Sequence, residues 1–173
     1  GSPPPDNSFL YGAEDPVGER CPFGAHIRRS NPRDSKVPQS AEEIAISNRH
    51  RILRVGRSFS AGGSGDEAAT RPGLLFMCLN VDIERQFEFI QQTWAMAGQF
   101  HGLENEVDPL IVRGVGEDGE PRLMARLTIP TPQGPLHLTG IRDFVRTRGG
   151  GYFFLPGRQA LQYLSRIQEA PND

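Results

Sequence analysis

The sequence predicts an α+β fold whose strands pair antiparallel. Residues 83–94 and 158–167 repeat apolar side chains at helical spacing, and the continuous apolar run 74–79 has the length of a buried strand. Strands and helices follow one another without the regular βαβ order of a parallel sheet, which favours an antiparallel α+β sandwich. The 173 residues are enough for one domain with a sizeable core.

The first third of the chain gives the weakest pattern. Residues 1–50 are rich in Pro, Gly, Asn and Arg and lack apolar periodicity, so we expect a long ordered loop with one short helical turn near Ala25. Residues 52–57 are typical of a short strand. The Gly/Ser-rich stretch 60–65 that follows is expected to be a mobile loop.

A buried strand over 74–79 is expected after Pro72-Gly73, and a helix over 83–94 after it. Asp82 is a plausible N-cap for that helix, because its carboxylate can accept hydrogen bonds from the first free amides. The apolar residues at helical spacing are Ile83, Phe87, Ile90 and Trp94.

The last third predicts three strands and a helix. Residues 122–129 and 135–139 are expected to form two strands joined by a Pro-Gln-Gly turn. Residues 151–155 are typical of an aromatic strand, and a final helix spans 158–167. The expected apolar face of that helix consists of Ala160, Leu161, Leu164 and Ile167.

Composition excludes several classes of function. The net charge of −2 and pI of about 6.1 argue against a general nucleic-acid binder. No apolar stretch approaches membrane-spanning length and no signal peptide is recognisable, so we expect a cytoplasmic protein without a membrane partner. The two cysteines, Cys21 and Cys78, make neither a disulfide framework nor a zinc site, and Cys78 is expected to be a buried thiol.

The segment CPFGAHIRRSNPR, residues 21–33, places His26 between an apolar run and three arginines. An imidazole on an ordered segment can ligate iron, and neighbouring guanidinium groups such as Arg28 suit the carboxylates of a haem. A histidine in a basic loop is the simpler interpretation of such a pattern. Zinc fits less well, because the other three histidines do not add the ligands that a zinc site needs.

Arg54 and Asp108 each allow two interpretations. An arginine at a strand start is ordinarily a surface charge, but a fixed cation beside bound peroxide stabilises the charge that develops as the O–O bond breaks. Asp108 precedes a proline and could simply form a turn. Alternatively it accepts the second N–H of a ligating histidine, which sets the tautomer and strengthens the ligand.

Three other patterns are discounted. Residues 114–119 spell GxGxxG, but two acids lie inside the motif and no helix follows, so we expect an acidic hairpin loop. The glycines at 149–151 are expected to let two backbones approach closely. His101 and Glu104 make a weak metal pair at best.

Four segments resemble the C-terminal half of the dye-decolorizing peroxidases, in the family's order. They are CPFGAHIRRSNPR (21–33), RILRVG (51–56), GLLFMCLNVDIERQFEFIQQTW (73–94) with EVDPL (106–110), and RGGGYFFLPG (148–157). The resemblance implies a ferredoxin-like antiparallel sheet with helices on one face, which is one half of a dimeric α+β barrel. It also implies bound haem b, and an iron-dependent peroxidase that oxidises small aromatic substrates with hydrogen peroxide.

The resemblance assigns roles to individual residues. His26 matches the proximal iron ligand, Arg54 the distal catalytic arginine, and Asp108 the acid that hydrogen-bonds the proximal histidine; Arg28 is expected to contact the cofactor as well. We divide the chain into an N-terminal extension, 1–20, and a haem-ligating ferredoxin-like domain, 21–173.

One departure from the family is clear. The distal aspartate of the family lies in a GxxDG motif of the N-terminal half, and these 173 residues contain no such motif. Two further hypotheses therefore stay open: a non-catalytic haem-binding or carrier domain, and a partner-dependent module that binds no haem. The expected partners are a second copy of the chain or a separate N-terminal half, and the chain is expected to be either a fragment or a naturally short protein.

Overall fold

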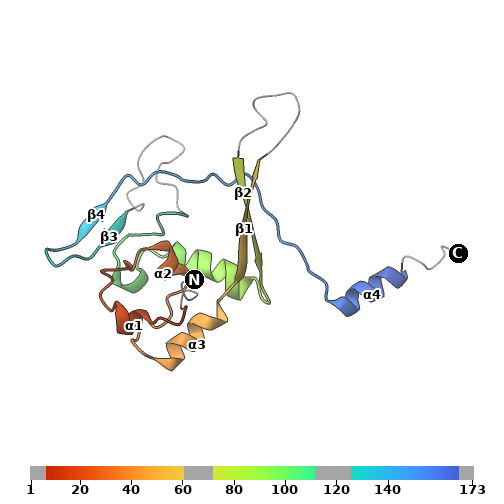
Figure 1. The fold of residues 1–173 in the computed structure, drawn as a ribbon, viewed down its shortest axis with the longest axis horizontal. Coiled ribbons are helices and arrows are strands. Elements are labelled where there is room, and N and C mark those ends of the chain that lie inside the picture. Colours follow the sequence, from red (N-terminus) through yellow and green to blue (C-terminus); the bar gives the residue numbers. More distant parts are fainter. Residues whose placement is uncertain (1–6, 61–71, 112–125, 168–173) are drawn as a thin grey trace, which may run out of the picture.

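The computed structural model describes residues 7–60, 72–111 and 126–167. The motif at 114–119, nearly all of the Gly/Ser-rich stretch 60–65 and the first part of the predicted strand 122–129 lie outside these residues. Figure 1 shows a body of short helices, a hairpin that rises from it, and a long C-terminal stretch that ends in a separate helix.

The helices of the body are short. They are α1 (Tyr11–Glu14), α2 (His26–Ser30), α3 (Ala41–Arg49), the π-helical turns η2 (Glu84–Glu88) and η3 (Ile90–Ala95), and the 3₁₀ turn η4 (Phe100–Gly102). The expected helix over 83–94 is present as η2 and η3, and the Asp82 carboxylate accepts a hydrogen bond from the Arg85 amide at 3.0 Å. The C-terminal helix α4 (Arg158–Ile167) has the predicted bounds.

The prediction of a loop with one helical turn over residues 1–50 was wrong for residues 41–49, which form α3. Its N-terminus has a capping sequence, because Ser40 is followed three positions later by Glu43, and the Ser40 hydroxyl accepts a hydrogen bond from the Glu43 amide at 3.3 Å. The short turn expected near Ala25 is α2, for which Ala25 is the N-cap residue.

The strands form two antiparallel hairpins. In one, β1 (Leu53–Ser60) pairs with β2 (Pro72–Leu79), with Arg54 opposite Cys78. In the other, β3 (Leu127–Ile129) pairs with β4 (Leu136–Leu138) through a turn in which the Gly134 amide donates to the Thr131 carbonyl at 3.0 Å. The α+β class and the antiparallel pairing are therefore confirmed.

Three expectations about the strands were wrong. Most of β2 is exposed, and Cys78 is only partly buried, because β2 pairs with β1 alone in a two-stranded sheet. A ring contact between Phe76 and Phe87 of η2, with ring centres 6.3 Å apart, covers only part of the strand. Residues 151–155 form no strand among the described residues, and Phe153 and Phe154 are 91% and 87% exposed. At Gly149 and Gly150 no atom lies within 4 Å of a built Cβ, so no close backbone approach occurs there.

The core lies where α2 packs against η3. Its buried apolar residues are Tyr11, Ile90, Ala95, Phe100 and Val107. Seven polar or charged residues are buried with them, and the two largest, Arg28 and Arg29, are consecutive in α2. Within the described part of the chain, no helix is long and apolar enough to cross a membrane.

Candidate functional site

His26 and Asp108 meet in the structure. The Nδ1 atom of His26 lies 2.7 Å from Oδ2 of Asp108, whose side chain is completely buried, whereas the imidazole is 42% exposed. An ionised carboxylate only accepts hydrogen bonds, so the hydrogen-bond network assigns the ring proton to Nδ1. The Nε2 lone pair is then available, and a neutral imidazole in this tautomer can ligate a metal.

The backbone around Asp108 fixes its carboxylate. Oδ1 accepts hydrogen bonds from the amides of Leu110 at 2.9 Å and Ile111 at 3.3 Å, while the Asp108 amide donates to the Ala95 carbonyl at 2.8 Å. Asp108 therefore does form a turn, as one of the two interpretations expects. The same carboxylate uses its other oxygen for His26, so the two interpretations of this residue are compatible.

Arg29 follows His26 by three positions in α2 and is completely buried. Its guanidinium donates to the carbonyls of Trp94, Ala95 and Ala97 and to the carbonyl of Glu106. Burial lowers the pKa of Arg29, and the nearby carboxylates of Asp108 and Glu106 act against that shift. Nothing in the sequence distinguishes this residue from Arg28.

Arg28, which is expected to contact a haem carboxylate, is completely buried in this arrangement and faces other protein groups. It donates to the carboxylate and carbonyl of Asp15, to the Cys21 carbonyl and to the Ser35 hydroxyl. Its guanidinium also lies between two aromatic rings, 4.3 Å from the ring centre of Tyr11 and 4.2 Å from that of Phe23. These partners are all protein groups, and a contact between Arg28 and a haem stays a prediction.

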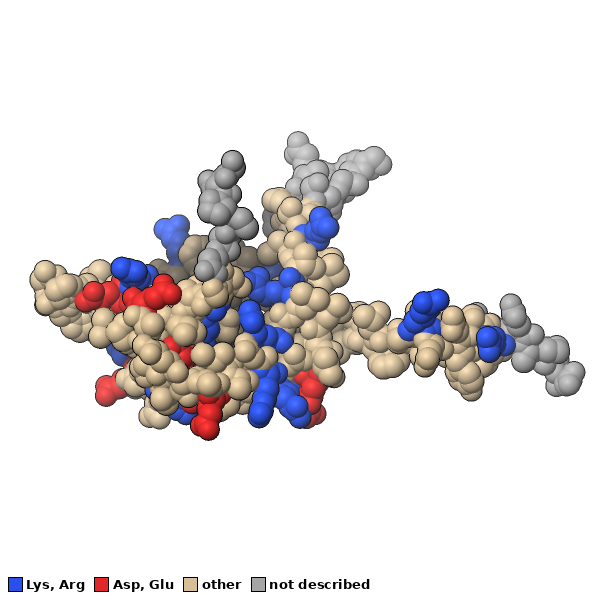
Figure 2. Space-filling view, turned by 60° about the horizontal axis from the view of Figure 1, so that its bottom comes forward, with Lys and Arg blue, Asp and Glu red and all other residues tan. Residues whose placement is uncertain are grey.

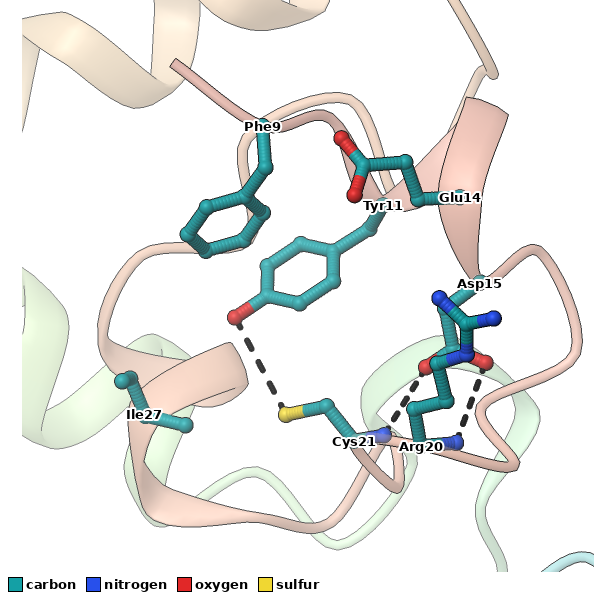
Figure 3. Close-up of a pocket in the computed structure, with 7 residues that line it drawn as sticks. All are labelled: Phe9, Tyr11, Glu14, Asp15, Arg20, Cys21 and Ile27. Carbon is teal, nitrogen blue, oxygen red and sulfur yellow. Dashed lines mark hydrogen bonds between the residues drawn. The ribbon is translucent and has the colours of Figure 1, made fainter. Parts of the chain in front are cut away.

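These contacts of Arg28 join residues 7–20 to the segment that carries His26. Arg33 adds hydrogen bonds to the carbonyls of Asn7 and Phe9. A pocket of about 290 Å³ opens between the two segments, with Phe9, Tyr11 and Ile27 among its lining residues. In Figure 3 the Tyr11 hydroxyl points at the Cys21 sulfur, 3.9 Å away, and burial is the main cause that raises the pKa of Tyr11.

Glu106 is a second buried acid beside the His26 segment. Oε2 accepts a hydrogen bond from the Thr128 amide at 3.0 Å, which ties β3 to the body, and Oε1 has no hydrogen-bond partner. A Cβ on Gly24 would collide with that carboxylate oxygen. Glycine is therefore needed two residues before His26, and the sequence alone did not indicate why.

Arg54 is exposed on β1. No hydrogen bond or ion pair joins it to His26 or Asp108, so the structure does not bring the predicted distal residue together with the proximal pair.

Two other histidines, His50 and His101, pack against aromatic rings. His101 stacks on Phe23 and meets the edge of Phe100, and its pKa falls to about 4, mainly because of burial and then because Arg28, Lys36 and Arg29 are nearby. His50 stacks on Phe89 with ring centres 3.9 Å apart. In the part of the chain that the structure describes, no group of three or more His, Cys, Asp or Glu side chains could hold a metal ion, so the weak pair at His101 and Glu104 gains no further ligand.

Comparison with known proteins connects this geometry to a family. No protein-family model matches the chain. The multifunctional dye peroxidase DyP2 of an Amycolatopsis species is 32% identical over 179 residues, which cover 93% of this chain and 36% of that protein. Peroxidase 2 of Mycetinis scorodonius is 32% identical over 158 residues, which cover 82% of this chain and 29% of that protein. The chain belongs to the dye-decolorizing peroxidase family.

The solved structures agree with this membership. The crystal structure of a DyP-type peroxidase from Anabaena aligns with a TM-score of 0.60 and 28% identity, over 81% of this chain and 28% of that one. The chain thus spans about a third of the length of the dye-decolorizing peroxidases it matches.

Proposed function

We propose that this chain is the haem-ligating part of a haem-dependent peroxidase of the dye-decolorizing type. The observation that carries the proposal is the pair formed by His26 and Asp108, in which a buried carboxylate holds the Nδ1 proton of a half-exposed imidazole. Family membership supports the same conclusion, since the relatives are named dye peroxidases and peroxidases.

The residues fit a haem held through a single axial bond. Nε2 of His26 is free to donate its lone pair, and the Asp108 carboxylate increases the electron density of the ring, as the acceptors behind metal-ligating histidines generally do. The sequence has no Cys-x-x-Cys-His segment for covalent attachment. We therefore propose non-covalently held haem b.

Bound haem would supply the iron that accepts electrons from small aromatic substrates and reduces hydrogen peroxide. The residues of this chain would prepare the site: His26 binds, Asp108 keeps the Nδ1 proton in place, and Arg54 supplies a fixed positive charge. A guanidinium has permanent charge and several donors, so it can stabilise the negative charge that develops on a peroxide oxygen.

The test is a haem titration followed by absorbance. Wild-type protein should develop a strong Soret band with saturable binding, whereas His26→Ala should not. The matched control is His137→Ala, because His137 is an exposed histidine whose Nδ1 lies 3.0 Å from the Thr128 hydroxyl, apart from the His26–Asp108 pair. An identical ferric spectrum for wild type and His26→Ala would contradict the assignment.

A non-catalytic haem-binding domain is the second candidate. The observation that favours it is the position of Arg54, which is exposed on β1 and which no hydrogen bond or ion pair among the described residues joins to His26 or Asp108. A fixed cation beside bound peroxide stabilises the charge that develops as the O–O bond breaks, so a domain without one would retain haem but turn over slowly. Dye turnover with peroxide, normalised to bound haem, separates the candidates, because a carrier retains haem without turning over substrate.

Exposed apolar side chains support a protein partner. The β1–β2 hairpin exposes Val55, Phe76 and Met77, and the stretch that leads through α4 exposes Phe153 and Leu161. On that stretch Figure 2 shows tan surface with basic groups on α4, which has no acidic residue between 158 and 167. Exposed apolar surface of this kind is typical of interaction sites.

We propose that a second copy of the chain, or the remaining portion of a longer family protein, covers this apolar surface. Light scattering on the purified chain tests the first of these. A dimer that Leu161→Glu converts to a monomer would support self-association, and a wild-type monomer at high concentration would contradict it.

A further inference from the structure

Two adjacent arginines of α2 bind segments that pack on different sides of the helix. Arg28 binds groups from residues 15–21 and 35, and Arg29 binds the segment that leads to Asp108. Both side chains are completely buried. The two arginines have the same charge and the same burial and lie in the same helix, but they contact different segments. A substitution of Arg28 is therefore a matched control for the same substitution of Arg29.

The acceptors of Arg29 lie at both ends of the segment 94–106. Nη1 donates to the Trp94 carbonyl at 2.8 Å, the Ala97 carbonyl at 3.0 Å and the Ala95 carbonyl at 3.3 Å, and Nη2 donates to the Glu106 carbonyl at 2.5 Å. One planar cation thus joins the end of η3 to a residue two positions before Asp108.

The Ala95 carbonyl connects Arg29 directly to the backbone of Asp108. It accepts from Nη1 of Arg29 and also from the Asp108 amide at 2.8 Å. A further backbone hydrogen bond, from the Glu106 amide to the Gly98 carbonyl at 3.1 Å, joins the two ends of the loop 98–106. Since His26 and Arg29 share the short helix α2, the imidazole and the segment that carries its carboxylate partner are tied to the same element.

We propose that Arg29 is a positioning residue for the His26–Asp108 pair, holding the Asp108 carboxylate at Nδ1 of His26 by fixing residues 94–106 against α2. Lysine cannot replace it, because an ammonium has three donors around one point and cannot reach carbonyls at both ends of the segment.

The first test uses protein without haem, so it does not depend on the proposed function. Protein carrying ¹⁵N-labelled histidine should show a slowly exchanging, downfield Nδ1–H resonance from His26 that is absent in His26→Ala. Arg29→Lys should lose or broaden this resonance, and the control Arg28→Lys should keep it. Retention in Arg29→Lys, or equal loss in both variants, would overturn the proposal, because either result removes the specific link to Asp108.

The second test measures haem affinity and rests on the proposed function. Outer partners of metal ligands typically contribute 10–100-fold to affinity, so Arg29→Lys should weaken haem binding by about that factor. In the Asp108→Asn background the same substitution should have little further effect, since Arg29 acts through Asp108. If Arg29→Lys weakens haem binding by the same factor in the Asp108→Asn background as in the wild type, the two residues act independently and the proposal is overturned. If wild-type protein binds no haem, the proposed function fails while the resonance test still decides the role of Arg29.

A measurement on the wild type covers the case in which Arg29→Lys does not fold. The amide protons of Glu106 and Asp108 should exchange with solvent slowly, at rates close to those of the α2 amides, because Arg29 fixes their segment to that helix. Rapid exchange of both amides in a folded protein with protected α2 would overturn the proposal.

Discussion

Nδ1 of His26 and Oδ2 of Asp108 are 2.7 Å apart although 82 positions separate the two residues in the chain. The carboxylate is completely buried and the imidazole is half exposed, so the pair joins the interior of the body to its surface. This arrangement lets the protein control the electron donation of the imidazole while its Nε2 atom stays accessible.

Asp108→Asn should raise the Fe(III)/Fe(II) potential of the haem complex and weaken haem binding about 10- to 100-fold. In the proposed haem complex the carboxylate would give the His26 imidazole partial imidazolate character, which would stabilise ferric iron, and the amide would remove that charge. Spectroelectrochemistry measures the potential. The control is Asp34→Asn, since Asp34 is equally buried but accepts from the amides of Gly12 and Gln39. If Asp108→Asn lowers the stability of the protein but leaves the potential unchanged, Asp108 only forms a turn.

Arg28→Met should lower the free energy of unfolding by about 3–5 kcal/mol, the usual cost of leaving one partner of a buried ion pair alone. The side chains of Arg28 and Asp15 are 0% and 7% exposed, and their pairing joins residues 7–20 to α2. Urea denaturation measures the stability, and faster proteolysis within 7–20 should accompany the loss. Arg20→Met, at an exposed position, should change stability by less than about 0.5 kcal/mol; similar losses in both variants would contradict the prediction.

Gly24→Ala should destabilise the protein by about 1–3 kcal/mol through overpacking. The added Cβ would collide with the buried Glu106 carboxylate and approach Cδ1 of Leu127 to 3.1 Å. Thermal or urea unfolding measures the loss. Gly150→Ala is the control, because no atom lies within 4 Å of a Cβ there, and the two alanine variants should differ clearly in stability.

Stability should fall as the pH drops from about 6.5 to about 4, in part because of His101. Burial lowers its pKa from 6.5 to about 4 in the folded protein, so over this range the unfolded chain binds a proton that the folded chain does not. Above pH 6.5 both states are neutral at this position and the contribution is flat. His101→Phe keeps an aromatic ring against Phe23 and should reduce the slope, whereas His137→Phe should leave it unchanged; equal slopes in wild type and His101→Phe would exclude His101 as the cause.

Local sequence was sufficient for several elements. The α4 bounds follow from apolar residues at helical spacing, and the β3–β4 hairpin follows from two short apolar runs around a turn that ends at Gly134. The capping sequence of α3, from Ser40 to Glu43, is also a local feature, although the polar composition around it is typical of a loop. Such features depend on neighbours within a few positions and need no tertiary information.

The family resemblance, the α+β class and the choice of His26 as the candidate ligand all follow from the amino-acid sequence alone. How charge is used around that residue depends on how distant segments pack against α2. Arg28 and Arg29 are identical and adjacent, yet one holds residues 7–20 and the other the segment leading to Asp108. Neighbouring helical residues point about 100° apart, so the elements packed on each side, which are distant in sequence, give each guanidinium its partners.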